Sequence, residues 1–296
     1  MKFAVMGAGA VGCYFGARLH QAGHDVTLIG RPSLVDAVQT RGLRLVMKEF
    51  DGCLPLQASA EPSAVRAADA ILFCVKSGDT EAAGASIAPF VSRECTVLCL
   101  QNGVDNAERL SRVLGNEAVP AVVYVAVEMA GAAHVVHHGR GELIIGPSPG
   151  SEAVANAFQA AGIPVQVSPA VMDALWAKLT ANCAYNALSA LTQLPYGELV
   201  RRPGMEQTIR DVVAECVAVA SAAGLHLPDR IVEDVFGLSQ SMAQQRSSTA
   251  QDLARGRRSE IDYINGHLAR EGDRLGVAVP LNRLLHALVR ARDDAL

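Results

Sequence analysis

The sequence predicts an α/β fold for residues 1–167 and an all-helical fold for residues 168–296. Three observations support this division. Short apolar runs alternate with helix-compatible segments in the first part. Long segments rich in Ala, Leu and Val then follow with helical periodicity. The length of 296 residues, with 50% hydrophobic and 19% charged residues, also suits two folded domains with sizeable cores.

The first domain opens with alternating strands and helices. Residues 3–6 predict a strand, residues 11–21 a helix, and residues 26–29 a second strand. Residues 70–75 and 96–100 are continuous apolar runs bounded by polar residues. Such runs are typical of strands that are buried on both faces of a parallel sheet.

The rest of the first domain extends this pattern. Residues 80–90 and 104–114 are long enough for the helices that connect parallel strands. Residues 121–127, 134–137 and 142–145 predict further strands, in a more antiparallel continuation of the sheet. The expected architecture is therefore a doubly wound sheet with helices between its strands.

The second domain is expected to contain helices only. They are predicted at residues 170–191, 205–223, 228–253, 260–275 and 281–295. Breaks containing Pro or Gly separate them, at residues 195–197, 202–204, 224–228 and 276–280.

Composition excludes several classes of partner. A formal net charge of -4 offers no basic field for nucleic acid. No run of eighteen apolar residues predicts a membrane span. The seven cysteines lack a Cys-x-x-Cys pair, which favours buried, reduced thiols and a cytoplasmic location. No metal site is expected, since His134, His137 and His138 lack clear carboxylate partners and are interpreted as solvated strand residues.

A glycine-rich turn follows the first predicted strand and opens the first helix. Its residues are Gly7, Ala8, Gly9, Ala10, Val11 and Gly12. The spacing alone is weak evidence, but its place between a strand and a helix is typical of a Rossmann-type dinucleotide site. Gly7 would permit the tight turn, Gly9 would let a pyrophosphate approach the backbone, and Gly12 would let helix and strand pack closely.

Polar residues follow the predicted strands at one edge of the sheet. Arg31 comes just after the second strand, where a carboxylate would favour NAD; a cation there favours the 2′-phosphate of NADP. Lys76 and Asn102 follow the next two strands. The alternatives are a solvated turn for Arg31, a solvated lysine and a loop-capping amide. Together, Arg31, Lys76 and Asn102 favour an NADP-binding crevice at the carboxyl edge of the sheet.

A second polar group lies in the helical domain. Lys178, Asn182 and Asn186 are four residues apart, on one face of a predicted helix. They could pair with another helix, or form a substrate-binding wall with Lys178 as the proton donor. Ser248 and Glu260 lie in segments that ordinary helix capping would also explain.

Taken together, these motifs resemble the ketopantoate reductase (2-dehydropantoate 2-reductase) family over almost the whole chain. The matching segments are the glycine turn, Val75-Lys76, Gln101-Asn102-Gly103, the Lys178 stripe and residues 260–266, in family order. The resemblance implies NADPH-dependent reduction of 2-dehydropantoate to (R)-pantoate in pantothenate and coenzyme A biosynthesis.

The resemblance also implies roles for individual residues. Lys178 and Glu260 would be catalytic, with Lys178 donating a proton to the ketone oxygen. Substrate-binding residues would be Asn102, Lys178, Asn182, Asn186 and Ser248. Cofactor-binding residues would be Gly7, Ala8, Gly9, Ala10, Val11, Gly12, Arg31, Lys76, Asn102, Ala126 and Glu260.

Two departures from the family pattern leave the substrate open. Tyr196 precedes Gly197-Glu198-Leu199 where an Asn is usual, and Gln245 stands where another Asn is usual. The alternatives are therefore a related NADP-dependent reductase of another small 2-keto acid, and a non-catalytic NADP-binding protein. The apolar helical domain is also compatible with a homodimer.

Overall fold

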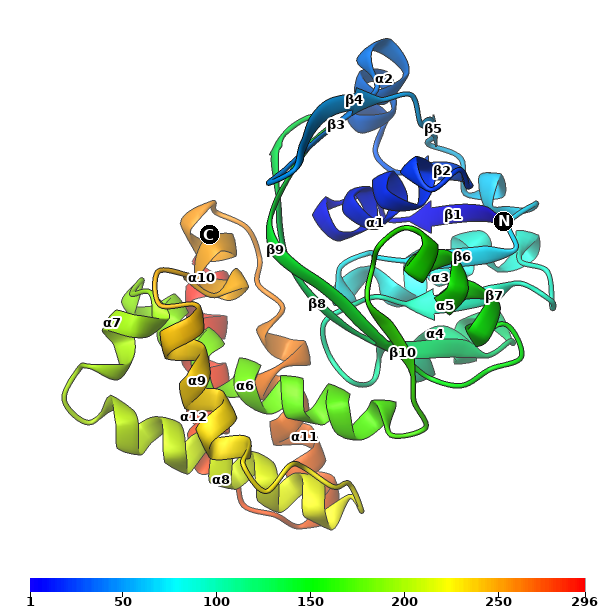
Figure 1. The fold of residues 1–296 in the computed structure, drawn as a ribbon. Coiled ribbons are helices and arrows are strands. Elements are labelled where there is room, and N and C mark those ends of the chain that lie inside the picture. The colour runs from blue at the N-terminus through cyan, green and yellow to red at the C-terminus, as the bar shows by residue number, and fades with distance from the viewer. Residues whose placement is uncertain (296) are drawn as a thin grey trace. The chain divides into compact units, whose positions relative to one another are not determined.

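Strand β1 (Lys2–Met6) is an interior strand of the sheet in the N-terminal part of the protein. We describe residues 1–295 from a computed structural model (Figure 1). The chain divides into two compact units, Met1–Val171 and Met172–Leu296. Each unit is described by itself below.

The sheet of the first unit contains ten strands among the described residues, in the order β4-β3-β9-β8-β7-β6-β1-β2-β5, with β10 paired to β9. Besides β1 they are β2 (Asp25–Ile29), β3 (Leu43–Met47), β4 (Phe50–Leu54), β5 (Gln57–Ser59), β6 (Ala70–Phe73), β7 (Thr96–Cys99), β8 (Ala118–Gly131), β9 (His134–Ile145) and β10 (Val165–Val167). Strand β1 pairs in parallel with β2 on one side and β6 on the other. The strand order therefore reverses between β1 and β6, the type of point where open α/β sheets bind ligands.

Helices cover both faces of this sheet. They are α1 (Ala10–Gln21), α2 (Pro32–Arg41), α3 (Thr80–Ile87), α4 (Asn106–Leu114) and α5 (Ser151–Ala160). In β1, Phe3 and Val5 join the core that includes α1 and α5, whereas Ala4 joins the core that includes α3 and α4. This alternation follows from the two-residue period of a strand and confirms the predicted doubly wound sheet.

Three parts of this unit differ from the expectation. Residues 32–59 contain α2 and strands β3, β4 and β5, and residues 151–167 contain α5 and β10; the sequence pattern predicted none of these. Of the strand residues in the β3–β4 hairpin, only Leu43 and Leu45 are buried, so its apolar signal is weak. Residues 134–137 and 142–145 belong to one strand, β9, because Gly139 and Gly141 interrupt the apolar pattern without ending the strand.

The second unit is helical, as predicted. Its helices are α6 (Val171–Thr192), α7 (Tyr196–Val200), α8 (Met205–Ala222), α9 (Ile231–Ser241), α10 (Ser248–Ala254), α11 (Asn265–Leu275) and α12 (Pro280–Asp293). None of the helices within residues 1–295 is long and apolar enough to cross a membrane.

Three helix predictions were wrong in detail. The predicted helix at 228–253 is two helices, because the chain turns after Ser241 and Ser247 caps a new one by accepting a hydrogen bond from the Ala250 N–H. The predicted break at 195–197 contains the start of α7. The predicted helix at 260–275 begins with a 3₁₀ turn, and α11 starts only at Asn265.

Candidate functional site

The glycine turn lies between the ends of three strands. The N–H groups of Gly7 and Ala8 both donate to the carbonyl of Ile29, at 3.0 Å each, which holds the turn at the end of β2. Gly7 has a φ of +92°, and a Cβ built on it would lie 2.6 Å from the backbone nitrogen of Val75. No other residue fits here, because both the left-handed backbone and the approach of the chain after β6 exclude a side chain.

Gly9 and Gly12 differ sharply in their surroundings. At Gly9, no described atom beyond its neighbours along the chain lies within 4 Å of the position that a Cβ would take. At Gly12, a Cβ would lie 2.7 Å from both the Gly7 carbonyl oxygen and Val5 Cγ1. Gly12 therefore permits the helix to pack on β1, whereas Gly9 leaves open space in front of the turn. Within α1, which is fully described, no side chain caps the N-terminus. Open space before an uncapped helix end fits a pyrophosphate.

Arg31 follows β2 beside this turn. Its carbonyl accepts hydrogen bonds from the N–H groups of Leu34 and Val35, so that Arg31 is the N-cap residue of α2. Its side chain is exposed. The cation therefore lies at the carboxyl end of the strand that holds the glycine turn.

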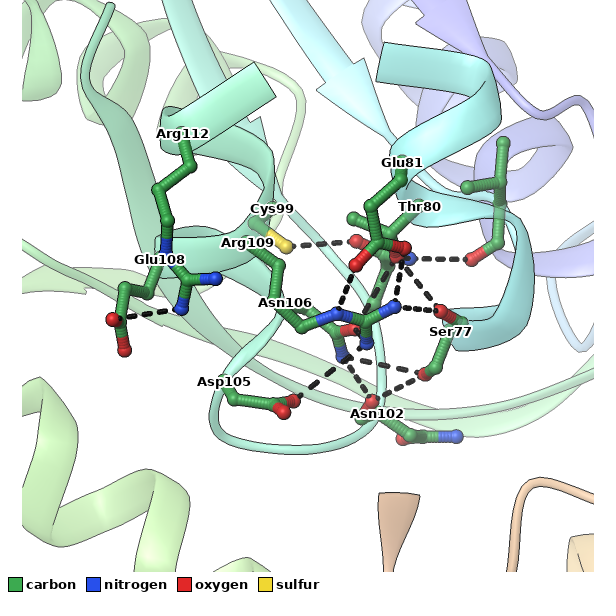
Figure 2. A network of polar contacts seen from close by, with 12 residues as sticks. Ser77, Thr80, Glu81, Cys99, Asn102, Asp105, Asn106, Glu108, Arg109 and Arg112 are labelled. Carbon is green, nitrogen blue, oxygen red and sulfur yellow. Dashed lines mark hydrogen bonds and ion pairs between the residues drawn. The ribbon is translucent and has the colours of Figure 1, made fainter. Parts of the chain in front are cut away.

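Lys76 and Asn102 lie on the loops that follow β6 and β7, and a buried polar network joins these loops (Figure 2). The Ser77 hydroxyl donates to the Asn102 carbonyl at 2.8 Å. Asn106 Nδ2 donates to the same carbonyl at 2.6 Å. The two loops are therefore tied together next to both candidate residues.

Gln101 extends the network toward the strands. Its Nε2 donates to the Val75 carbonyl at 3.0 Å and to Thr80 Oγ1 at 2.8 Å, while its Oε1 accepts from Cys99 Sγ at 2.9 Å. Burial raises the pKa of the Cys99 thiol to about 12, so the sulfur keeps the proton that this contact needs.

Arg109 links the network to Glu81 of α3. Its guanidinium donates to the Ser77 carbonyl at 3.0 Å and binds Glu81 through two nitrogens, at 2.7 and 2.6 Å. The hydrogen bonds from Arg109 lower the pKa of the Glu81 carboxyl below its ordinary value. The pair therefore stays ionised at neutral pH.

Sequence reasoning missed the network residues beyond the strand ends: Ser77, Thr80, Glu81, Asn106 and Arg109. Their partners on the other loop are 21 to 32 positions away in the chain, as in the Gln101–Thr80 and Arg109–Ser77 contacts. The one local signal is Asn106 itself, four residues after Asn102. Ala126 lies in β8, between two register shifts against β9.

The second unit carries the remaining candidates. Lys178, Asn182 and Asn186 all lie on α6; the first two are partly buried and Asn186 is only 3% exposed. Tyr185, three residues after Asn182, packs on Tyr196 with ring centroids 4.5 Å apart. An aromatic pair therefore adjoins the polar stripe.

Ser248 and its neighbour Ser247 have different places. Ser247 is buried and its hydroxyl donates to the Asn186 carbonyl at 3.2 Å, whereas Ser248 is exposed at the start of α10. The two residues that depart from the family pattern are joined directly, because the Tyr196 N–H donates to the Gln245 carbonyl at 3.0 Å.

Glu260 is 9% exposed, and the residue before it, Ser259, is held by hydrogen bonds. The Ser259 hydroxyl and N–H both donate to the Asp293 carboxylate, at 2.7 and 3.0 Å. Ser259 therefore anchors the chain to α12, and Glu260 is held just before the 3₁₀ turn.

The histidines of β9 were only partly predicted. The ring of His137 stacks on Tyr14 at 4.5 Å and is not simply solvated, while His138 contacts Glu128 at 3.1 Å. The expectation of a solvated side chain was wrong for His137, whose ring stacks on Tyr14 of α1, and for His134, whose Nε2 is buried. For His138 it missed the carboxylate contact with Glu128. Within residues 1–295, no three His, Cys, Asp or Glu residues form a group that could hold a metal ion.

Comparison with known proteins covers both units. The family described as ketopantoate reductase PanE/ApbA matches residues 3–150, and its C-terminal family matches residues 170–293. A 2-dehydropantoate 2-reductase of Halobacterium salinarum is 35% identical, with 98% of each chain covered. A PanE/ApbA family ketopantoate reductase from Ralstonia eutropha JMP134 has a TM-score of 0.97 and 56% identity, over 100% of this chain and 99% of the other.

A more distant structure shares the fold and carries a different activity in its name. D-mandelate dehydrogenase, solved with NADH and anilino(oxo)acetate, has a TM-score of 0.93 and 25% identity, over 100% of this chain and 99% of the other. The two family matches together span most of the present sequence. This chain therefore belongs to the ketopantoate reductase family.

Proposed function

We propose that this protein reduces 2-dehydropantoate to (R)-pantoate with NADPH. The observation that carries the proposal is the pairing, in a chain of this family, of an open glycine turn with the Lys178-Asn182-Asn186 stripe of α6. The first supplies a place for a dinucleotide, and the second supplies a cation and two amides for a small keto acid. Residues 1–167 would bind NADPH and residues 168–296 would carry the catalytic residues.

The cofactor fits the residues of the first unit. Gly7, Ala8, Gly9, Ala10, Val11 and Gly12 would form the turn that holds the pyrophosphate. Arg31 would bind the 2′-phosphate, and Lys76, Asn102 and Ala126 would contact the remainder of the cofactor. Glu260, which belongs to the second unit, is also proposed as a cofactor contact. NADPH supplies a hydride when it is bound.

The second unit would bind and protonate the substrate. Lys178 Nζ would hold a proton next to the ketone oxygen and stabilise the negative charge that develops there. Asn182, Asn186 and Ser248 would orient the keto acid, and Glu260 would act with Lys178. Besides NADPH and the small substrate, the proposed reaction needs no further partner. We also propose that the protein forms a homodimer and is located in the cytoplasm.

The decisive experiment compares substrates at saturating NADPH. We expect kcat/KM to be highest for 2-dehydropantoate among a panel of small 2-keto acids that includes pyruvate, 2-ketoisovalerate and phenylglyoxylate. Consumption of NADPH is followed by its absorbance. A clear preference for another acid would overturn the assigned substrate, and cofactor binding without turnover of any acid would indicate a non-catalytic NADP-binding protein.

Another keto acid is the second candidate because of Tyr196 and Gln245. These residues are joined through the backbone, and Tyr196 packs on Tyr185 beside the α6 stripe. An aromatic side chain at this place would favour a larger apolar substituent than an amide would. If phenylglyoxylate leads the panel, Tyr196→Asn should shift the preference toward 2-dehydropantoate.

Arg31 should determine the preference for NADPH. Arg31→Ala removes the charge proposed to pair with the 2′-phosphate, so we expect the KM for NADPH to rise on the order of 10-fold. The KM for NADH should change little. Steady-state kinetics with each cofactor test this, with Arg41→Ala, an exposed arginine at the other end of α2, as the control. Equal losses for both cofactors would contradict the role of Arg31.

A further inference from the structure

Asn106 has an unusual set of contacts for the first residue of a helix. It is 2% exposed, and its side chain does not cap α4, whose N-cap residue is Asp105. Instead, Nδ2 donates to the Asn102 carbonyl at 2.6 Å and to Ser77 Oγ at 3.3 Å. Oδ1 accepts from Arg109 at 3.1 Å and from the Thr80 hydroxyl at 3.3 Å. One carboxamide therefore uses both its donor and its acceptor atoms (Figure 2).

These contacts join two separate parts of the sheet edge. Asn102 belongs to the loop after β7, whereas Ser77 directly follows Lys76 in the loop after β6. Besides the glycine turn, Arg31 and Ala126, the first-unit residues that we assign to NADPH lie on these two loops. A buried amide is costly unless its hydrogen bonds are all satisfied, so packing alone would be served better by an apolar residue.

The outer contacts hold the amide in one orientation. Arg109 is fixed by Glu81 on one side and by the Ser77 carbonyl on the other. With Arg109 and Thr80 donating to Oδ1, only Nδ2 is left to face the Asn102 carbonyl. A flipped amide would oppose donor to donor and oxygen to oxygen. The orientation is therefore set by the network.

We propose that Asn106 is a positioning residue for the cofactor: it holds the Lys76 and Asn102 loops at the separation that NADPH binding requires. This inference rests on the proposed function only in assigning these two loops to NADPH. Asn106 itself would not touch the cofactor; it acts through the Asn102 carbonyl and Ser77.

The test compares Asn106→Asp with the wild-type protein. The carboxylate keeps acceptors for Arg109 and Thr80 but loses the donor for Asn102 and Ser77, and places like partial charges against the Asn102 carbonyl. We expect the Kd for NADPH, measured by fluorescence without any keto acid, to rise on the order of 10-fold. The KM for the keto acid at saturating NADPH should rise less than the Kd for NADPH, because Asn182 and Asn186 of α6 are unaltered.

A matched control lies on the same helix. Arg112→Ala removes an exposed ion pair with Glu108 that contacts neither loop, and should leave the Kd unchanged. If Asn106→Asp does not fold, Asn106→Ala is measured in its place, since alanine has no side-chain donor. A Kd within twofold of wild type in the folded variant overturns the proposal, even if the melting temperature falls.

The same data separate this inference from the proposed function. Wild-type protein that binds NADPH but does not reduce 2-dehydropantoate would contradict the function alone, and the comparison of Kd values would still decide the role of Asn106. Wild-type protein that binds no NADPH would overturn both.

Discussion

Replacing Lys178 with methionine is expected to reduce kcat on the order of 10²–10⁴-fold. The residue supplies the only cation of the stripe that also contains Asn182 and Asn186, all on α6. Methionine keeps much of the aliphatic length but removes both the proton and the positive charge that would stabilise the developing alkoxide. The measurement is kcat for 2-dehydropantoate at saturating NADPH, alongside the Kd for NADPH.

The controls for Lys178 are Lys48→Met and cofactor binding. Lys48 is exposed in the turn between β3 and β4, so its replacement should leave kcat unchanged. Lys178→Met should still bind NADPH, because the glycine turn lies in the other unit. A kcat within threefold of wild type would remove Lys178 from the mechanism.

Replacement by alanine should weaken NADPH binding at Gly9 and lower the stability of the protein at Gly12. Gly9→Ala adds a methyl group to space that is open among the described residues, so folding should be preserved. The methyl group would occupy the space proposed for the pyrophosphate, and we expect the Kd for NADPH to rise about 10-fold or more.

Gly12→Ala should act on stability. Its methyl group would lie 2.7 Å from the Gly7 carbonyl oxygen and from Val5 Cγ1, so helix and strand must separate. Such overpacking costs about 1–3 kcal/mol, measurable as a loss in the free energy of unfolding by urea. Normal NADPH affinity in Gly9→Ala, with normal stability in Gly12→Ala, would refute both glycine roles.

Local pattern was sufficient for several elements. Strands β1, β6 and β7 were predicted because strands buried on both faces are apolar throughout. The Lys178 stripe was placed on one helix because its spacing matches the helical period. The Arg31, Lys76 and Asn102 positions followed from the rule that parallel strands end at one edge.

Other features depended on contacts between distant segments. Ser247 and Ser248 are alike in sequence, yet only Ser247 is buried, because it meets the Asn186 carbonyl from α6. The helix expected at 228–253 breaks where this contact forms. Asn265, the first residue of α11, donates from its side chain to the Cys183 carbonyl, 82 positions away.

By itself, the sequence determined the fold class, the glycine turn, the cation that follows β2 and the polar stripe of α6. The tertiary structure decided how the loops after β6 and β7 are joined, through Asn106 and Arg109. The physical reason is that periodicity and spacing describe one element at a time. A buried amide, in contrast, gains stability only from partners that strand order brings to it, and those partners are far away in the chain.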